Sequence, residues 1–325
     1  MDRSVAIEAS SLGKVYGGVT AIDALSFQVH SGEIFGLLGP NGVGKSTTLR
    51  ILITLLKPTS GRATVLGRDV TAEPEEVRRL IGYVPQERAI DRFLTGREHL
   101  LLLGDLYHLS KHEALRRIEQ LLKLVNLEDR ADDPARTYSG GMKRKLDIAC
   151  GLLPNPKILF LDEPTLGLDV QSRLRVWEHI RQLHVQGLTV VMTTNYLDEA
   201  DQLCDRVAII DGGRIKALGS PSELKAGLGG DGISLAVSHG SEGRIDALLG
   251  ALEGLPFVRS VKRTSEGIDV RVESSEKALP AVLETANRLV CHLDSVDYRR
   301  PRLDDVFVAY TGRAIRDEFP KSDDA

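Results

Sequence analysis

The residue types and spacing between Gly39 and Thr47 are those of a loop that binds phosphate groups. The stretch reads Gly39-Pro40-Asn41-Gly42-Val43-Gly44-Lys45-Ser46-Thr47 and fits the pattern G-x-x-x-x-G-K-[ST]. Glycines let successive backbone N–H groups turn toward a phosphate, and Lys45 can reach the β- and γ-phosphates. The Ser46 hydroxyl can bind Mg²⁺. The sequence therefore predicts a site for a nucleoside triphosphate and its magnesium ion.

The segments on either side of this loop read as a strand and a helix. Ile34 to Leu38 is a continuous apolar run, typical of a buried strand, and the helical pattern after the loop extends to about Leu56, before Pro58. This order places the loop at a helix N-terminus, where backbone N–H groups favour anions. The context favours a phosphate site over the alternative, a glycine-rich surface turn.

Two adjacent carboxylates, Asp162 and Glu163, follow the apolar run Ile158 to Leu161. The pattern places both at the carboxyl end of a buried strand, the edge at which α/β sheets bind ligands. One carboxylate can orient the ligands of Mg²⁺ while the other polarises an attacking water molecule. Taken alone, the pair is equally consistent with a solvated strand end. The phosphate loop upstream favours the catalytic interpretation.

A second candidate phosphate site lies at Ser139-Gly140-Gly141, which offers a hydroxyl and two permissive backbone donors at a predicted helix N-terminus. For the tripeptide alone, a capped helix start is the better interpretation. However, residues 39–47 already supply all the phosphate contacts that one nucleotide needs. A second site in the same domain suggests that it serves a nucleotide bound by another subunit.

Strand-like and helix-like segments alternate over much of the chain, which implies a mostly parallel sheet covered by helices. The expected fold class is thus α/β. Residues 90–153 interrupt this alternation with a helical period and are predicted to form an all-helical insertion. Asp211-Gly212-Gly213 reads as a hairpin turn, so the sheet should end on an antiparallel edge.

The chain divides into four predicted parts. Residues 1–225 form a nucleotide-binding domain, with the helical subdomain at about 90–153, and residues 226–232 form a glycine-rich linker. Residues 233–312 form a small α+β accessory domain with the order β-α-β-β-α-β, and residues 313–325 form a flexible, charge-rich tail.

The composition is that of an ordinary globular protein, with 325 residues, 42% hydrophobic and 27% charged. No apolar stretch approaches the roughly 18 residues needed to cross a bilayer, and no signal pattern precedes Ile7, so we expect the chain in the cytoplasm unless a partner holds it at a membrane. Cys150, Cys204 and Cys291 lack metal-ligand spacing, which fits a reducing compartment. The net charge of −4 gives no support to nucleic-acid binding.

Six motifs, taken together, resemble those of ABC transporter ATP-binding subunits in order and approximate spacing. They are the phosphate loop, Gln86, Ser139-Gly140-Gly141, Asp162-Glu163-Pro164, Gly167-Leu168-Asp169 and Thr193-Thr194, within about residues 4 to 222. The C-terminal part resembles the daunorubicin-resistance type of exporter ATPase through Arg300-Pro301-Arg302-Leu303-Asp304-Asp305-Val306-Phe307 and Thr311-Gly312. The implied fold is a P-loop NTPase of the ABC type with a helical subdomain and a small C-terminal α+β domain.

The resemblance implies a role for each motif residue in ATP hydrolysis. Glu163 would be the general base, Asp162 would hold the Mg²⁺ shell together with Ser46, and Gln86 would contact Mg²⁺ or the attacking water. Tyr16 would stack on the adenine ring, while Lys45 would bind the phosphates and assist their hydrolysis.

The resemblance also implies a dimer that holds two ATP molecules between head-to-tail subunits. Ser139, Gly140 and Gly141 would bind the γ-phosphate held by the opposite protomer, and Asp169 would lie in a loop that crosses the interface. The pair would be a homodimer or would combine the chain with a similar ATPase subunit.

Two positions depart from the family pattern. Tyr138 and Met142 flank the serine and glycines of the second phosphate site, where the family usually has leucine and glutamine. Asn195 stands where the family usually carries a histidine that senses the γ-phosphate. Asparagine can still donate a hydrogen bond to a phosphate but does not become cationic near neutral pH. We hypothesise that Asn195 is a neutral phosphate sensor and that hydrolysis is correspondingly slow.

The resemblance predicts the energy-coupling ATPase of an exporter, which drives a separate transmembrane permease for a drug or another hydrophobic substrate. It would lie at the cytoplasmic face of the membrane, held there by the permease. One alternative is a soluble ABC ATPase that acts on ribosomes or DNA, disfavoured because the chain has one nucleotide domain and no heptad run. Another is the ATPase of an importer, which the Leu303-Asp304-Asp305-Val306-Phe307 segment disfavours. No nucleic-acid partner is expected.

Overall fold

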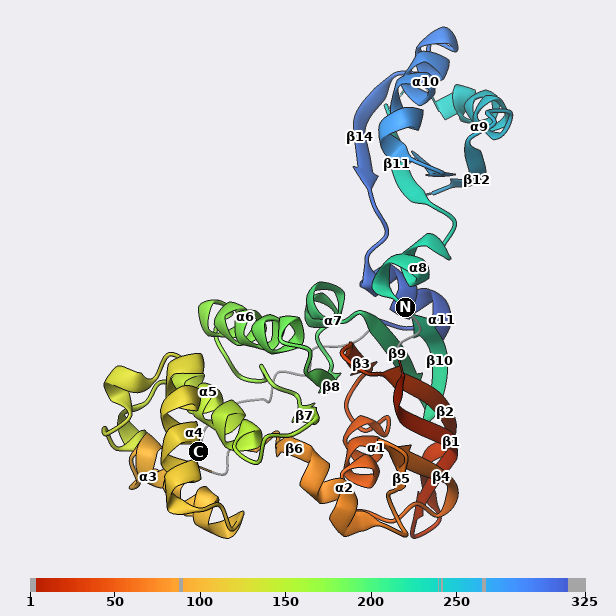
Figure 1. Cartoon of the computed structure of the whole chain (residues 1–325). Coiled ribbons are helices and arrows are strands. Elements are labelled where there is room, and N and C mark those ends of the chain that lie inside the picture. Colours follow the sequence, from red (N-terminus) through yellow and green to blue (C-terminus); the bar gives the residue numbers. More distant parts are fainter. Residues whose placement is uncertain (1–3, 88–89, 239, 241, 265–266, 315–325) are drawn as a thin grey trace, which may run out of the picture. The chain divides into compact units, whose positions relative to one another are not determined.

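The computed structural model describes residues 4–87, 90–238, 240, 242–264 and 267–314. The chain divides into two compact units, a first unit that includes Met1–Ser220 and a second unit formed by Pro221–Ala314 (Figure 1). Most of the predicted tail at 313–325 lies outside the described residues. The two units are described in turn.

A six-stranded sheet with the order β10-β9-β3-β8-β7-β6 forms the centre of the first unit. Five of its strands are parallel: β3 (Ile34–Leu38), β6 (Ile81–Val84), β7 (Ile158–Asp162), β8 (Thr189–Thr194) and β9 (Arg206–Asp211). Every residue of β3, β7 and β8 is buried, as expected for apolar runs that are covered on both faces. The hairpin predicted at Asp211-Gly212-Gly213 is confirmed, because β10 (Arg214–Gly219) pairs antiparallel with β9.

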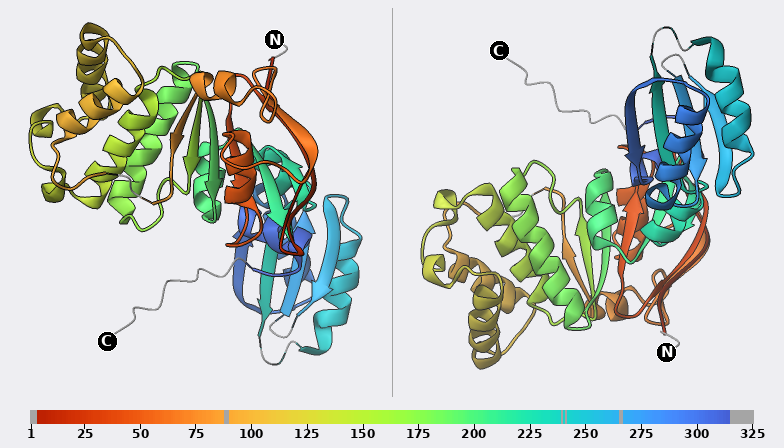
Figure 2. Two further views of the ribbon diagram at one scale, coloured as in Figure 1. Left: turned by 90° about the horizontal axis from the view of Figure 1, so that it is seen from below. Right: turned by 90° about the horizontal axis from the view of Figure 1, so that it is seen from above.

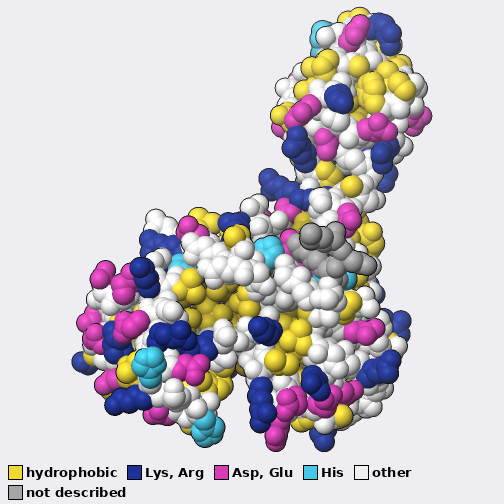
Figure 3. All heavy atoms as spheres, viewed as in Figure 1, with side chains coloured by type: hydrophobic (Ala, Val, Ile, Leu, Met, Phe, Trp, Pro, Cys, Tyr) yellow, Lys and Arg dark blue, Asp and Glu magenta, His cyan; other side chains and the backbone are white. Residues whose placement is uncertain are grey.

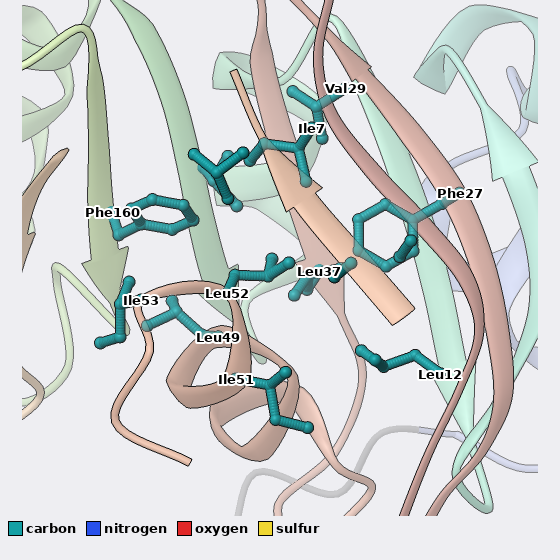
Figure 4. Packing of buried hydrophobic residues seen from close by; sticks show 14 of the residues in the cluster. Ile7, Leu12, Phe27, Val29, Leu37, Leu49, Ile51, Leu52, Ile53 and Phe160 are labelled. Atoms are coloured by element: carbon teal, nitrogen blue, oxygen red, sulfur yellow. The ribbon is translucent and has the colours of Figure 1, made fainter. Parts of the chain in front are cut away.

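A second, antiparallel sheet packs against the first through α1. Its order is β2-β1-β4-β5, and its strands are β1 (Val5–Tyr16), β2 (Val19–His30), β4 (Ser60–Val65) and β5 (Arg68–Asp69). Leu49 and Leu52 of α1 belong to one buried cluster with Phe27 of β2 and Phe160 of β7 (Figure 4). This shared core fixes the position of the helix that follows the phosphate loop.

The helices beside these sheets are α1 (Lys45–Leu52), α2 (Pro74–Leu80), α6 (Val170–Val185) and α7 (Leu197–Leu203). The prediction that the first helix extends to about Leu56 is wrong. It ends at Leu52, because Thr54 adopts a left-handed backbone conformation with φ of 66° that a helix does not accommodate.

Residues 90–153 contain no strand in the part of the chain that the structure describes. Their helices are α3 (Gly96–Leu106), α4 (Lys111–Leu124) and α5 (Gly140–Leu152), with short 3₁₀ turns at Glu128–Arg130 and Ala135–Thr137. Serine or threonine side chains accept a backbone N–H at the start of each α-helix, namely Thr95, Ser110 and Ser139. The three helices lie together at one end of the first unit (Figure 2).

The second unit is a four-stranded antiparallel sheet with the order β12-β13-β11-β14. Its elements, in chain order, are α8 (Pro221–Ala226), β11 (Asp231–Val237), a 3₁₀ turn (Glu242–Arg244), α9 (Ile245–Glu253), β12 (Val258–Arg263), β13 (Gly267–Val272), α10 (Ser275–Arg288), β14 (Leu293–Arg299) and α11 (Leu303–Thr311). Leu248 of α9 and Val282 of α10 are fully buried against Ile233 and Val270 of the sheet. The predicted order β-α-β-β-α-β is present.

The limits of the second unit differ from the predicted domain boundaries. The unit begins at Pro221 rather than after residue 225, because α8 packs against α11 within it. The strand β11 begins at Asp231, inside the predicted linker 226–232.

On the face shown in Figure 3, acidic and basic side chains are interspersed rather than gathered in a basic area. Among the described residues, no helix is both long enough and apolar enough to span a membrane.

Candidate nucleotide-binding site

The predicted phosphate loop lines a pocket of about 320 Å³ in the first unit. Gln86 and Glu163, which follow β6 and β7, line the same pocket. The full lining consists of Asn41, Gly42, Gly44, Lys45, Ser46, Thr47, Gln86 and Glu163. Parallel pairing of the strands therefore brings together residues that are far apart in the sequence, at the carboxyl edge of the sheet.

Two glycines of the loop are required by close contacts with other backbone atoms. A Cβ on Gly39 would lie 2.3 Å from the Ile210 carbonyl oxygen, and a Cβ on Gly44 would lie 2.5 Å from that of Ala21. Gly44 also has φ of 103°, a conformation that favours glycine. Pro40 and Val43 complete the predicted loop without lining the pocket.

The Lys45 ammonium group is buried at the base of the pocket. Its Nζ donates to the carbonyl oxygens of Gly39, at 2.7 Å, and Pro40, at 3.0 Å, and lies 3.4 Å from Oε1 of Glu163. Burial lowers the pKa of Lys45, and the nearby carboxylates of Glu163 and Asp162 oppose that shift. A bound phosphate would add negative charge and further favour the ammonium form.

Asp162 joins the loop to the adjacent strand β8. Its Oδ1 accepts hydrogen bonds from Ser46 Oγ at 3.0 Å and from Thr193 Oγ1 at 2.5 Å. A hydroxyl and a carboxylate side by side are oxygen donors of the kind that Mg²⁺ prefers. The Ser46 hydroxyl and the Asp162 carboxylate therefore fit a magnesium ion that shares its coordination with nucleotide phosphates.

The backbone at Glu163 is strained. This residue has φ of 44°, in the left-handed region, which costs a non-glycine residue roughly 1–2 kcal/mol. Two contacts of its N–H with Thr193, to the hydroxyl at 2.9 Å and to the carbonyl oxygen at 3.2 Å, hold it there. Such strain is common where a side chain must be aimed at a reacting group.

Tyr16 and Asn195 do not line the pocket. Tyr16 ends β1, is 45% exposed and has the Lys14 ammonium 5.1 Å from its ring centroid. Asn195 follows β8, and its Oδ1 is buried without a hydrogen-bond partner among the described residues. An orphaned acceptor of this kind fits a side chain that awaits a donor such as a water molecule.

Glu199, which sequence reasoning missed, joins α7, the helix that follows Asn195, to Thr165 and to Trp177 of α6. Its Oε1 accepts hydrogen bonds from Thr165 Oγ1 at 2.8 Å and Trp177 Nε1 at 2.9 Å. The side chain is fully buried, and burial raises the pKa of the carboxyl group. No sequence pattern around Glu199 predicted these hydrogen bonds.

Ser139, Gly140 and Gly141 lie outside the pocket of their own chain. The Ser139 hydroxyl accepts the Met142 N–H at 3.2 Å at the exposed start of α5. A Cβ on Gly141 would meet Ser172 Oγ at 2.8 Å. The exposed Asp169 caps α6 by accepting the Ser172 N–H at 2.9 Å, and the hydrogen bonds with Ser172 lower its pKa. The second candidate phosphate site thus adjoins the start of α6.

Arg144 is a second residue that sequence reasoning missed. It lies on α5, is only 3% exposed and donates to the carbonyl oxygens of Pro85, Asp162 and Pro164. A signal was available, because Arg144 follows Gly141 by three residues and precedes Ile148 by four, so it falls on the buried face of the helix.

Comparison with known proteins agrees with this geometry. Residues 22–166 match the family model described as ABC transporter. The daunorubicin/doxorubicin resistance ATP-binding protein DrrA of Streptomyces peucetius is 44% identical, over 96% of this chain and 94% of that protein. The chain belongs to the ABC transporter ATP-binding subunits.

Two further relatives extend this result. The Nod factor export ATP-binding protein I of Sinorhizobium fredii is 39% identical, over 96% of this chain and 88% of that protein. Among solved structures, an ATP-binding cassette described as a dimer in a post-hydrolysis state with ADP and Pi has a TM-score of 0.59 and 28% identity, over 66% of this chain and 98% of that one. The predicted family, the predicted ABC-type fold and the predicted ATPase activity are confirmed, with ATP as the nucleotide. The individual residue roles stay predictions.

Replacing Gly44 with alanine tests the geometry of the loop. We expect Gly44→Ala to weaken ATP binding by at least about tenfold, because a Cβ at φ of 103° and 2.5 Å from the Ala21 oxygen forces the loop to move. Equilibrium titration with a fluorescent ATP analogue measures the change. Gly250→Ala is the control, because a Cβ there meets no heavy atom within 4 Å. Wild-type affinity in Gly44→Ala would contradict the role of this contact.

Proposed function

We propose that this ABC ATPase powers an exporter by closing as a dimer around two ATP molecules and opening after hydrolysis. The observation that carries the proposal is the convergence of the phosphate loop, Gln86 and Glu163 on one pocket. Each of these parts comes from a different strand end, and together they supply the contacts that phosphoryl transfer to water needs.

Within the pocket each side chain has a distinct task. The backbone N–H groups of residues 41–47 and the Lys45 ammonium bind the phosphates and favour the negative charge that develops on them. Glu163 accepts a proton from the attacking water, and its strained backbone aims the carboxylate. Ser46 and Asp162, with Gln86, would hold a magnesium ion, whose positive charge would favour the negative charge that develops on the phosphates.

The proposed dimer explains why the second phosphate site lies outside the pocket of its own chain. Ser139 is exposed and Gly140 is half-buried, so the Ser139 hydroxyl and the N–H groups at the start of α5 can bind the γ-phosphate of an ATP molecule held by the opposite protomer. Asp169 sits beside this surface and would cross the interface with it. The Tyr16 ring is exposed and available to stack on the adenine ring.

The proposed partner is a separate transmembrane permease that holds this subunit at the cytoplasmic face of the membrane. The relatives named above are described as a drug-resistance ATP-binding protein and an export ATP-binding protein, which supports export over import. We propose that the cargo is a drug or another hydrophobic molecule. The alternative of an ATPase that acts on ribosomes or DNA has no such support.

The catalytic role of Glu163 is tested with Glu163→Gln. The amide cannot accept a proton from water, so we expect ATP hydrolysis to fall by about 10²-fold or more, while the phosphate loop still binds ATP. The same variant should accumulate as an ATP-bound dimer, which size-exclusion chromatography with light scattering detects. Unaltered hydrolysis in Glu163→Gln would exclude Glu163 as the base.

The sensor role of Asn195 is tested with Asn195→His. An imidazole at this position can become cationic next to the γ-phosphate, so we expect turnover to rise. We also expect turnover to depend on pH, with a midpoint at about pH 6.5. Steady-state ATPase rates measured between pH 5.5 and 8.5 report both effects. If turnover and its pH profile were the same in both proteins, Asn195 would not be the phosphate sensor.

The export proposal is tested by reconstitution with the membrane protein encoded beside this chain. We expect the pair to accumulate daunorubicin in inside-out vesicles only when ATP is supplied, and Glu163→Gln to abolish that accumulation. Isolation of the chain on ribosomes or DNA, with no membrane protein bound, would contradict the proposal.

A further inference from the structure

A buried arginine from the helical subdomain joins three segments of the ATPase site. Arg144 Nε donates to the Pro164 carbonyl oxygen at 2.7 Å, Nη1 to that of Pro85 at 2.7 Å, and Nη2 to that of Asp162 at 3.0 Å. These acceptors are main-chain atoms, so the contacts fix backbone position rather than side-chain identity. One guanidinium group therefore connects α5 with the ends of β6 and β7.

The three carbonyl groups adjoin the residues that the ATPase proposal uses. Asp162 and Pro164 flank Glu163 directly, and Pro85 immediately precedes Gln86. Glu163 has φ of 44°, so its backbone needs support from neighbouring contacts. Thr193 provides that support from one strand, and Arg144 binds the carbonyl groups of the residues before and after the strained residue.

The guanidinium group is suited to this position. It presents five N–H donors in a rigid, planar fork that stays charged, whereas a lysine ammonium is a single point of charge. A cation that is 3% exposed carries a large desolvation cost unless carbonyl or carboxylate oxygens surround it. Three carbonyl oxygens and the Asp147 carboxylate, whose Oδ2 lies 3.9 Å from Nη1, provide that environment.

We propose that Arg144 is a positioning residue for ATP hydrolysis, which sets the geometry of Glu163 and Gln86 from the helix that begins at the second phosphate site. The inference rests on the proposed role of Glu163 as the base. Arg144 lies on the same helix as Ser139, just beyond its first turn. Movement of α5 when its N-terminus meets the ATP of the opposite protomer would thus reach the catalytic carboxylate of its own site.

The test compares Arg144→Met and Arg144→Lys with the wild-type chain. Arg144→Met removes all three hydrogen bonds, and we expect kcat to fall by about 10- to 100-fold, because a small displacement of the base is enough for such a loss. The Kd for ATP should change by less than about threefold, since Arg144 donates to none of the residues from 41 to 47. Arg144→Lys keeps the positive charge but lacks the planar set of guanidinium donors, so it should give an intermediate kcat.

Arg116→Met is the matched control on the neighbouring helix α4. Arg116 is exposed and makes no hydrogen bond or ion pair with another described residue, so this variant should keep wild-type kcat and Kd. Circular dichroism and thermal unfolding check that each variant is folded. Should Arg144→Met not fold, wild-type kcat in Arg144→Lys overturns the inference by itself.

A double-mutant cycle separates this inference from the proposed role of Glu163. In the Glu163→Gln background, Arg144→Met should cause little further loss of residual hydrolysis, because the group that it positions is already disabled. Wild-type hydrolysis in Glu163→Gln overturns the proposed base and this inference with it. Wild-type kcat in Arg144→Met, or an equal loss of kcat and ATP affinity, overturns the positioning role alone.

Discussion

The site depends on the buried approach of Lys45 to Glu163. Moving either charge out of water is expensive, and each group offsets part of the cost of burying the other. Lys45 starts the helix after β3 and Glu163 follows β7, with β8 paired between these two strands. The pair therefore forms only when three parallel strands are in register. Hydrogen bonds from Lys45 to Gly39 and Pro40 connect the same ion pair to the loop backbone.

In the proposed dimer, the groups that bind phosphate lie on two separate surfaces of each chain. The pocket gathers the groups that are proposed to contact phosphates, metal and water, from the phosphate loop, Gln86 and Glu163. Ser139, which is proposed to bind the ATP of a second chain, lies outside this pocket at the start of α5, where Gly141 packs against Ser172. A single chain with this layout is suited to binding ATP in one place and to closing over the ATP of a second chain in another.

Sequence patterns predicted the parts of the site that are local. The phosphate loop, the carboxylates after β7 and the capped start of α5 each occupy a few adjacent residues whose types report their backbone geometry. The order of the six strands is not local, and neither is the strain at Glu163, which depends on contacts with Thr193. The helical spacing places Arg144 on the buried face of α5, but its partners could not be predicted, because they are carbonyl groups, which every residue carries. The early end of α1 has the same origin, since the left-handed conformation of Thr54 is not a property of threonine alone.

The place of β3 in the sheet also determines when, during synthesis of the chain, the nucleotide site can form. This strand lies between β8 and β9, so its residue Leu37 pairs with Thr193 and Ala208, both synthesised much later. At about 5–20 residues per second, the strand that carries the phosphate loop waits on the order of ten seconds or more for its first neighbour in the sheet. During that interval a fully apolar segment has no parallel partner. The nascent first unit therefore resembles a slow-folding protein of high contact order, and its nucleotide site can form only near the end of its translation.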